Sequence, residues 1–152
     1  MAYKVFISYS TQDLPYVNAT KAYLESFGIK TFVAQYDIPP GANIGEDVGK
    51  AINASDAFLV LWSGNARQSG WVQSEIGVAR QAGKLIVPVL LHTNIEPPAF
   101  LPGIKCMRAW EPGDCSLLVG DLMKRSDSKD LGSAALVFLA IVLVIAVVFG
   151  KE

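Results

Sequence analysis

Short apolar runs alternate with amphipathic segments along most of this chain. Five runs rich in β-branched and aromatic residues predict strands, and they span 4–10, 29–33, 57–62, 85–91 and 104–110. The run at 57–62 contains no charged or hydroxyl side chain, which is typical of a strand covered on both faces. Pro88 interrupts the fourth run, and because proline cannot donate to a sheet ladder we expect it near a strand end or a sheet edge.

Segments with apolar residues at helical spacing separate the predicted strands. They predict helices over 15–27, 44–54, 69–82 and 114–125. Gly28 and Gly83 are placed to end the first and third of these helices. Between the second strand and the second helix, residues 34–43 contain Pro39-Pro40-Gly41, which blocks both a helix and a central strand, so we expect a loop there. A loop of that length in a compact domain is often functional.

The alternation of strands and helices predicts a parallel sheet with right-handed crossovers. We therefore expect an α/β fold of the flavodoxin-like kind, with a five-stranded parallel sheet and helices on both faces. Such folds bind ligands beyond the carboxyl ends of their strands. The tips that follow Ser10, Val33 and Ser63 lie at that end of the sheet, and the helix over 69–82 begins shortly after Ser63.

The last part of the chain has a different composition. Residues 131–150 contain no charge and no proline, and their number matches the hydrocarbon thickness of a bilayer, so they predict a single transmembrane helix. The basic residues that precede the run place the domain on the cytoplasmic side by the positive-inside rule. No signal peptide precedes the domain. We expect a tail-anchored, single-pass membrane protein with a domain at 1–125, a linker at 126–130 and a span at 131–150.

Charge and motif content exclude several kinds of function. A net charge of −1 argues against a broad nucleic-acid-binding surface. Cys106 and Cys115 lack metal-ligand spacing and His92 is the only histidine, so we expect no metal site. No G-x-G-x-x-G follows the first strand, and 45–51 is too short for a P-loop and lacks its Ser or Thr. A phospho-receiver domain would need an aspartate after the third strand, where Ser63 stands.

Trp71 and Glu75 stand four positions apart at the start of the third helix, behind a capping Ser69 or Gly70. That spacing puts an indole and a carboxylate on one helix face, so we expect them to look out together. An indole can stack on a flat charged ring, and a carboxylate can stabilise positive charge that develops beside it. The pair is also common on ordinary surface helices, where the helix dipole favours glutamate.

Four segments, in this order, resemble the TIR domain (Toll/interleukin-1 receptor) family in its prokaryotic form. They are Val5–Ser10, the Pro-Gly loop with the helix after it, Phe58–Ser63, and the motif Ser69-x-Trp71-x-x-x-Glu75. The resemblance covers about residues 2–125. It implies a flavodoxin-like fold and self-association with other TIR domains. In prokaryotic, plant and some animal members it also implies cleavage of NAD, as a substrate and not a cofactor, at the nicotinamide–ribose bond.

The resemblance also implies roles for single residues. Glu75 matches the catalytic glutamate of the NAD-cleaving members, and Trp71 and Ser69 match residues of the same pocket. Three further positions are expected to contact NAD, although some relatives have arginine or an aromatic residue there: Ser10, Thr11 and Ile44. A loop that moves or docks on a neighbouring subunit when the active assembly forms is expected at these residues: Asp37, Pro39, Pro40 and Gly41.

The chemistry needs only one carboxylate. Nicotinamide leaves a cationic pyridinium as a neutral ring, so what must be stabilised is the oxocarbenium-like ribose, which Glu75 would face. We expect an NAD+ nucleosidase that releases nicotinamide and ADP-ribose or a cyclic derivative, in antiviral defence or stress signalling. The alternatives are a non-enzymatic adaptor that recruits other TIR domains to the membrane, and an effector whose membrane span does the damage.

Overall fold

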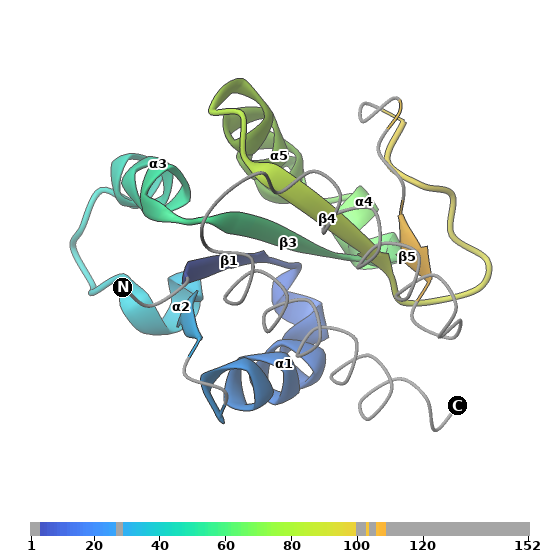
Figure 1. Ribbon diagram of the computed structural model, residues 1–152, viewed down its shortest axis with the longest axis horizontal. Helices are drawn as coiled ribbons and strands as arrows, with labels where there is room; N and C mark the ends of the chain where they lie inside the picture. Colours follow the sequence, from blue (N-terminus) through green and yellow to red (C-terminus); the bar gives the residue numbers. More distant parts are fainter. Residues whose placement is uncertain (1–3, 27–28, 100–102, 104–105, 109–152) are drawn as a thin grey trace, which may run out of the picture.

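The computed structural model describes residues 4–26, 29–99, 103 and 106–108. Its parallel sheet has the order β2-β1-β3-β4-β5 (Figure 1). The strands are β1 (Lys4–Ser8), β2 (Lys30–Phe32), β3 (Ala57–Trp62), β4 (Leu85–Leu90) and β5 (Met107–Arg108). The predicted α/β fold with a parallel sheet is therefore confirmed. Of the fifth predicted strand, over 104–110, the structure describes a strand at two residues only.

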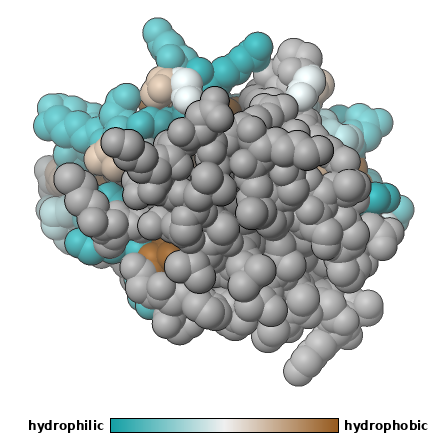
Figure 2. Space-filling model, viewed as in Figure 1, coloured by the Kyte–Doolittle hydropathy of each residue, from teal (hydrophilic) through white to brown (hydrophobic). Residues whose placement is uncertain are grey.

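Helices cover both faces of this sheet. In Figure 1, α1 lies on one side, and α3 and α5 lie next to each other on the opposite side. The helices are α1 (Leu14–Ser26), which follows the 3-10 turn η1 (Thr11–Asp13), then α2 (Ala34–Asp37), α3 (Ile44–Ala54), α4 (Gly64–Arg67) and α5 (Gly70–Gln81). Figure 2 shows hydrophilic side chains along the rim of the molecule where α3 and α5 lie.

The core between the sheet and α3 and α5 fixes which face each β1 side chain occupies. Phe6 and Phe58 are fully buried, stack on each other with ring centroids 5.3 Å apart, and share one apolar cluster with Ile76 of α5. Side chains alternate between the two faces of a strand. Ser8 therefore faces α5 as Phe6 does, and the extended backbone beyond it carries Ser10 toward the same side. The carboxyl end of β1 thus presents polar side chains to α5.

The predicted loop over 34–43 is wrong at its start, because α2 forms there. The Asp37 carboxylate reaches back and accepts a 2.7 Å hydrogen bond from the N–H of Val33, the N-cap residue. The Asp37 N–H donates to the Val33 carbonyl at 3.0 Å. This pair of bonds closes one helical turn before the prolines. The sequence analysis does not predict the second short helix, α4, whose N-terminus is capped by Ser63.

Pro88 does not lie where the sequence led us to expect it. It pairs with Val60 inside β4, which lies between β3 and β5, so the prediction of a strand end or a sheet edge is wrong. The Leu91 N–H donates to the Trp62 carbonyl of β3 at 3.0 Å. Because N–H directions alternate along a strand, the backbone nitrogen of residue 88 faces away from β3, so proline removes no hydrogen bond from the β3–β4 ladder. On the other side of β4, the described pairing with β5 begins only at Val89.

Within the described residues, no helix combines the length and apolar character that crossing a bilayer requires. The predicted span over 131–150 lies outside the described residues, as do the linker at 126–130 and the predicted helix at 114–125. Gly28, which we expected to end the first helix, also lies outside them.

Candidate active site

The helix α5 carries the two residues that the sequence singles out, and a serine starts it. The Ser69 hydroxyl accepts a 3.3 Å hydrogen bond from the Val72 N–H, so the predicted capping serine is confirmed. The helix ends before Gly83, whose φ of +67° is a conformation that glycine adopts without strain. Both ends of α5 are therefore set by local sequence.

Glu75 points into the protein and is only 5% exposed. Burial raises the pKa of Glu75 to about 8, and the nearby Ser8 hydroxyl acts against that rise. Ser8 Oγ is itself buried and makes no hydrogen bond of good geometry, so we regard its contact with the carboxyl as weak. In this arrangement Glu75 holds a proton at neutral pH.

Trp71 lies one turn earlier and is 46% exposed, so the expectation that Trp71 and Glu75 look out together is wrong for the carboxyl group. The apolar stripe of α5 consists of Val72, Ile76 and Ala79, and position 75 falls inside that stripe at helical spacing. Position 71 falls at its border. Trp71 therefore offers an accessible indole, while Glu75 lies beneath the surface.

Ile44 and Trp71 are exposed large apolar side chains, and Ile44 is 52% exposed. Ile44 begins α3 and Trp71 stands in the first turn of α5, and these two helices pack on each other. The two side chains are therefore available to an apolar or aromatic part of a ligand.

A polar cavity of about 270 Å³ lies at the carboxyl ends of β1 and β3. It brings together two of the predicted substrate-binding residues, Ser10 and Ser69. Three residues that the sequence analysis did not select complete the wall: Gln12, Asn65 and Gln68. Ligands of such folds bind beyond the carboxyl ends of the strands, so the positions just after Ser10 and Ser63 could have pointed to these three residues. Thr11 is exposed and does not line this cavity.

A buried carboxylate lies under the cavity wall. Asp13 is 4% exposed and accepts hydrogen bonds from the Ser63 hydroxyl and, at 3.3 Å, from Asn65 Nδ2. The Asp13 N–H donates to the Ser10 carbonyl at 2.8 Å. Ser63 also accepts the Ala66 N–H at 3.0 Å, which caps α4. The Asp13 side chain thus links the segment after β1 to the segment after β3 by hydrogen bonds.

The predicted assembly loop lies between α2 and α3. Pro39, Pro40 and Gly41 are exposed, and Gly41 has a φ of +85°. The Asp37 carboxylate holds α2 together through its bond to the Val33 N–H. The structure therefore places Asp37 in a short helix and the other three predicted residues in the loop proper.

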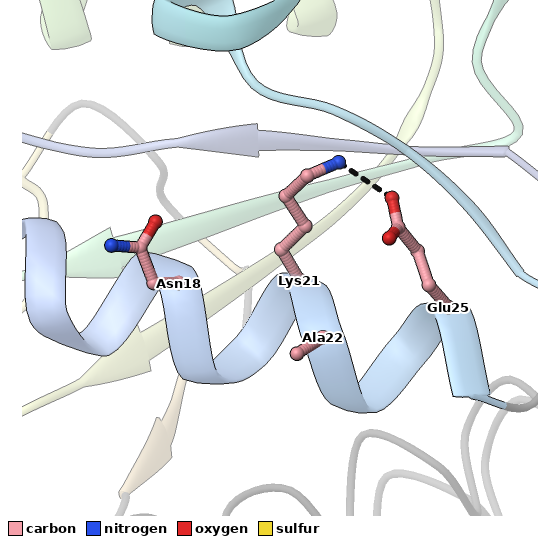
Figure 3. Close-up of a pocket in the computed structure, with 4 residues that line it drawn as sticks. All are labelled: Asn18, Lys21, Ala22 and Glu25. Carbon is pink, nitrogen blue, oxygen red and sulfur yellow. Dashed lines mark hydrogen bonds and ion pairs between the residues drawn. The ribbon is translucent and has the colours of Figure 1, made fainter.

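A second cavity, of about 210 Å³, lies on α1 and is lined by Asn18, Lys21, Ala22 and Glu25 (Figure 3). Lys21 Nζ and the Glu25 carboxylate point at each other and lie 2.5 Å apart. The Lys21 ammonium, together with the Thr31 hydroxyl, lowers the pKa of Glu25. These polar groups bind one another, so the cavity offers a ligand little.

Metal binding has no support in the parts of the chain that the structure describes. There, no three His, Cys, Asp or Glu side chains lie close enough together to hold an ion. Cys106 is a half-buried free thiol, and burial raises its pKa.

Comparisons with known proteins identify the family. The TIR domain of the Toll-related receptor TRR-2 from Hydra magnipapillata has a TM-score of 0.67 and 26% identity, with 82% of this chain and 98% of that one covered. The TIR domains of the activated Roq1 resistosome, which recognises the effector XopQ, have a TM-score of 0.54 and 19% identity, with 96% and 85% covered. A search of the curated proteins finds no match. Residues 5–117 match the TIR domain family, and the chain belongs to that family.

Proposed function

We propose that this TIR domain cleaves NAD at the bond between nicotinamide and ribose. Some TIR domains cleave NAD and others act as adaptors. The observation that favours the enzyme is the placement of Glu75, a carboxyl group removed from water with one weak polar contact, from Ser8. Burying such a group costs stability, and a buried carboxyl group with a strongly perturbed pKa is typical of a functional site. An adaptor needs no carboxyl group there.

The reaction follows from what Glu75 and Trp71 offer. In the reaction the bond from the ribose C1′ to the pyridinium nitrogen breaks, and its electron pair neutralises the nicotinamide ring. Glu75 first gives its proton to water, and the carboxylate that remains stabilises the positive charge left on the sugar. The exposed Trp71 indole packs against the sugar or the ring. Water then bonds to C1′ and loses a proton, which gives ADP-ribose; capture by a group of the same molecule gives a cyclic product.

The proposal extends to the setting in which this chemistry occurs. The apolar run over 131–150 holds the chain in a bilayer, and the basic residues before it keep the domain on the cytoplasmic side. TIR domains self-associate, and the exposed loop around Pro39, Pro40 and Gly41 is the segment that docks on a neighbour. The membrane-bound assembly acts in defence or stress signalling, as a TIR domain of the kind found in prokaryotes.

The test follows NAD by chromatography with the full chain reconstituted in lipid vesicles. Glu75→Gln keeps the size of the side chain and leaves it unable to form a carboxylate, and we expect it to lower nicotinamide release at least about 100-fold. Glu25→Gln on α1 is the matched control, because Glu25 pairs with Lys21 on the opposite face of the sheet, and it should leave the rate unchanged. NAD that stays intact on densely loaded vesicles, together with capture of other TIR domains, would favour the adaptor.

A further inference from the structure

The Ser8 hydroxyl is, among the described residues, the one fully buried side-chain polar group that lacks a hydrogen bond of good geometry. The residue is 1% exposed and ends β1. Its neighbour in the sheet is Val60 of β3, which is apolar and fully buried. A buried hydroxyl without a partner costs stability, and an alanine in the same place would not. The position of Ser8 therefore suggests a role other than packing.

Glu75 faces Ser8 across the contact between β1 and α5. Ser8 shares a strand face with Phe6, which meets Ile76 of α5 in one apolar cluster. As the crossover between the parallel strands β3 and β4, α5 runs opposite to β1. Moving from Phe6 toward the carboxyl end of β1 therefore means moving from Ile76 toward the start of α5. That step leads to Ser8 and Glu75, and the hydroxyl lies close enough to act on the pKa of the carboxyl group.

Charged side chains stand on several elements around α5, but none of them is among the causes that act on the pKa of Glu75. The elements in contact with α5 are β1, α3, α4 and β4. The exposed Lys4 lies at the opposite end of β1 from Ser8, and β4 has no charged residue. On α4, Arg67 pairs with the Glu96 carboxylate at 3.7 Å. The helix α3 has three charged residues, of which the first two pair with each other at 3.0 Å: Glu46, Lys50 and Asp47.

Two further charged groups lie on α5 itself and after β1. Arg80 stands in the last turn of α5, and the Asp13 carboxylate accepts hydrogen bonds from Ser63 and Asn65. Burial and the Ser8 hydroxyl are thus the two causes that act on the pKa of Glu75. Burial favours the neutral acid, whereas a donor hydroxyl favours the carboxylate. The support that the carboxylate receives therefore comes from Ser8.

The strength of this contact depends on the proton of Glu75. While Glu75 is neutral, the Ser8 hydroxyl has no hydrogen bond of good geometry. Once that proton has passed to water, the carboxylate is a strong acceptor, and Ser8 donates a hydrogen bond to it while keeping its own proton. A hydrogen bond to an ionised group is roughly twice as strong as one between neutral groups. The hydroxyl therefore stabilises the state of Glu75 that the proposed reaction uses.

We propose, on the basis of the proposed function, that Ser8 is a positioning residue whose hydroxyl binds and orients the Glu75 carboxylate. Ser8 acts through Glu75, since it is itself buried beneath the surface. It sets the direction of the anion and increases the share of Glu75 that is ionised at neutral pH. The motif on α5 thus depends on a serine at the end of β1.

The pH dependence of NAD cleavage by the full chain in lipid vesicles tests this role, because kcat/KM reports the ionisation of groups in the free enzyme. Ser8→Ala removes the donor and should raise the pKa of Glu75 from about 8 by about one unit. The value of kcat/KM should then be about tenfold below that of the wild type at pH 7 and about twofold below it at pH 9. Spontaneous loss of NAD, measured at each pH with Glu75→Gln, is subtracted.

Ser55→Ala is the matched control. It also removes a buried serine hydroxyl, one that donates to the Ala51 carbonyl at 2.7 Å after α3, and it should keep the wild-type pH profile. A Ser8→Ala variant that loses activity by the same factor at every pH would show that Ser8 only packs. An unchanged profile would show that Glu75 does not use the hydroxyl. Either result would overturn the proposal.

Carbon NMR measures the same pKa without catalysis and so separates this proposal from the proposed function. The full chain with 13C-labelled glutamate, held in detergent, is titrated across neutral and alkaline pH. The Glu75 carboxyl signal is the one that Glu75→Gln removes. We expect its pKa to rise by about one unit in Ser8→Ala and to stay unchanged in Ser55→Ala. Such a rise in a protein that leaves NAD intact would support the bond from Ser8 and overturn the enzyme. Cleavage that depends on Glu75, with the same pKa in Ser8→Ala, would overturn the role of Ser8 alone.

Discussion

Glu75 couples the proposed chemistry to the stability of the fold. Its pKa is about 8 in the folded protein, against 4.5 for an ordinary glutamate, because burial disfavours the charged form. Between these values the folded state binds more protons than the unfolded state. The free energy of unfolding therefore falls as the pH rises from about 4.5 to about 8, by at most about 5 kcal/mol from this group.

Glu75→Gln should remove that pH dependence. The amide is neutral at every pH, so we expect the variant to be more stable than the wild type at pH 9 and to differ much less at pH 5. Urea unfolding of both proteins at the two pH values measures the difference. A stability gap between them that stays constant with pH would show that Glu75 ionises as readily in the folded chain as in water.

We expect Trp71 to matter for the binding of NAD and Trp62 for the stability of the fold. Trp71→Ala should change the free energy of unfolding by less than about 1 kcal/mol, because the indole is 46% exposed, yet it should raise the KM for NAD. Trp62→Phe removes the 2.9 Å hydrogen bond from the buried indole N–H to the Glu96 carbonyl and should cost about 1–3 kcal/mol. Thermal unfolding and NAD kinetics of both variants check this. A large loss of stability in Trp71→Ala would mean that this indole is part of the core.

The sequence predicts correctly the helices and strands whose limits are marked by a capping residue or by an uninterrupted apolar run. The bounds of α3 and β3 agree with the structure because Asn43 caps the helix and the strand is apolar throughout. The short helices α2 and α4 give no periodic pattern, since four residues make one turn. Pro88 was misplaced because the direction of a missing N–H is known only once the neighbouring strands are known.

The site shows the same division between local and long-range information. Trp71 and Glu75 lie within α5 and Ser69 caps it, so their spacing is visible in the sequence. Asn65 is held in the cavity wall by its hydrogen bond to Asp13, fifty-two residues away along the chain, and no local pattern predicts that contact. The inward direction of Glu75 could have been found from the apolar stripe of α5, at Val72 and Ile76, which brackets position 75.

The carboxylate of Asp37 caps the start of α2 through the Val33 N–H, and its removal is a test at the level of this element. Asp37→Ala leaves the N–H of the buried Val33 without its 2.7 Å bond, so we expect a loss of about 1 kcal/mol and faster amide hydrogen exchange at Val33. Asp47→Ala, in the first turn of α3, should cost only a few tenths of a kcal/mol through the helix dipole. Unchanged exchange at Val33 would show that the backbone bonds of α2 suffice.

For the whole molecule, the sheet order explains how distant segments form one site. The strands β1 and β3 are neighbours, so the segments that follow them meet at one edge although they are far apart in the sequence. The helix α5 begins shortly after β3 and carries Trp71, and α3, which carries Ile44, packs on α5. The loop proposed to dock on another TIR domain leads directly into α3. Association of two domains and the shape of the site are therefore connected through α3.

That connection predicts how activity depends on density at a membrane. If 131–150 spans a bilayer as proposed, chains held there meet at a much higher effective concentration than free chains, which favours weak self-association. At constant total protein, the rate of NAD cleavage per molecule should rise as the same chains are placed on fewer vesicles. Pro40→Ala together with Gly41→Ala should flatten that rise, because alanine is strained at the φ of +85° that Gly41 adopts and the docking loop would change shape. A rate per molecule independent of density would mean that single domains are active and that the bilayer serves only to locate them, whereas chains that remain in solution when vesicles are sedimented would remove the premise of a membrane span.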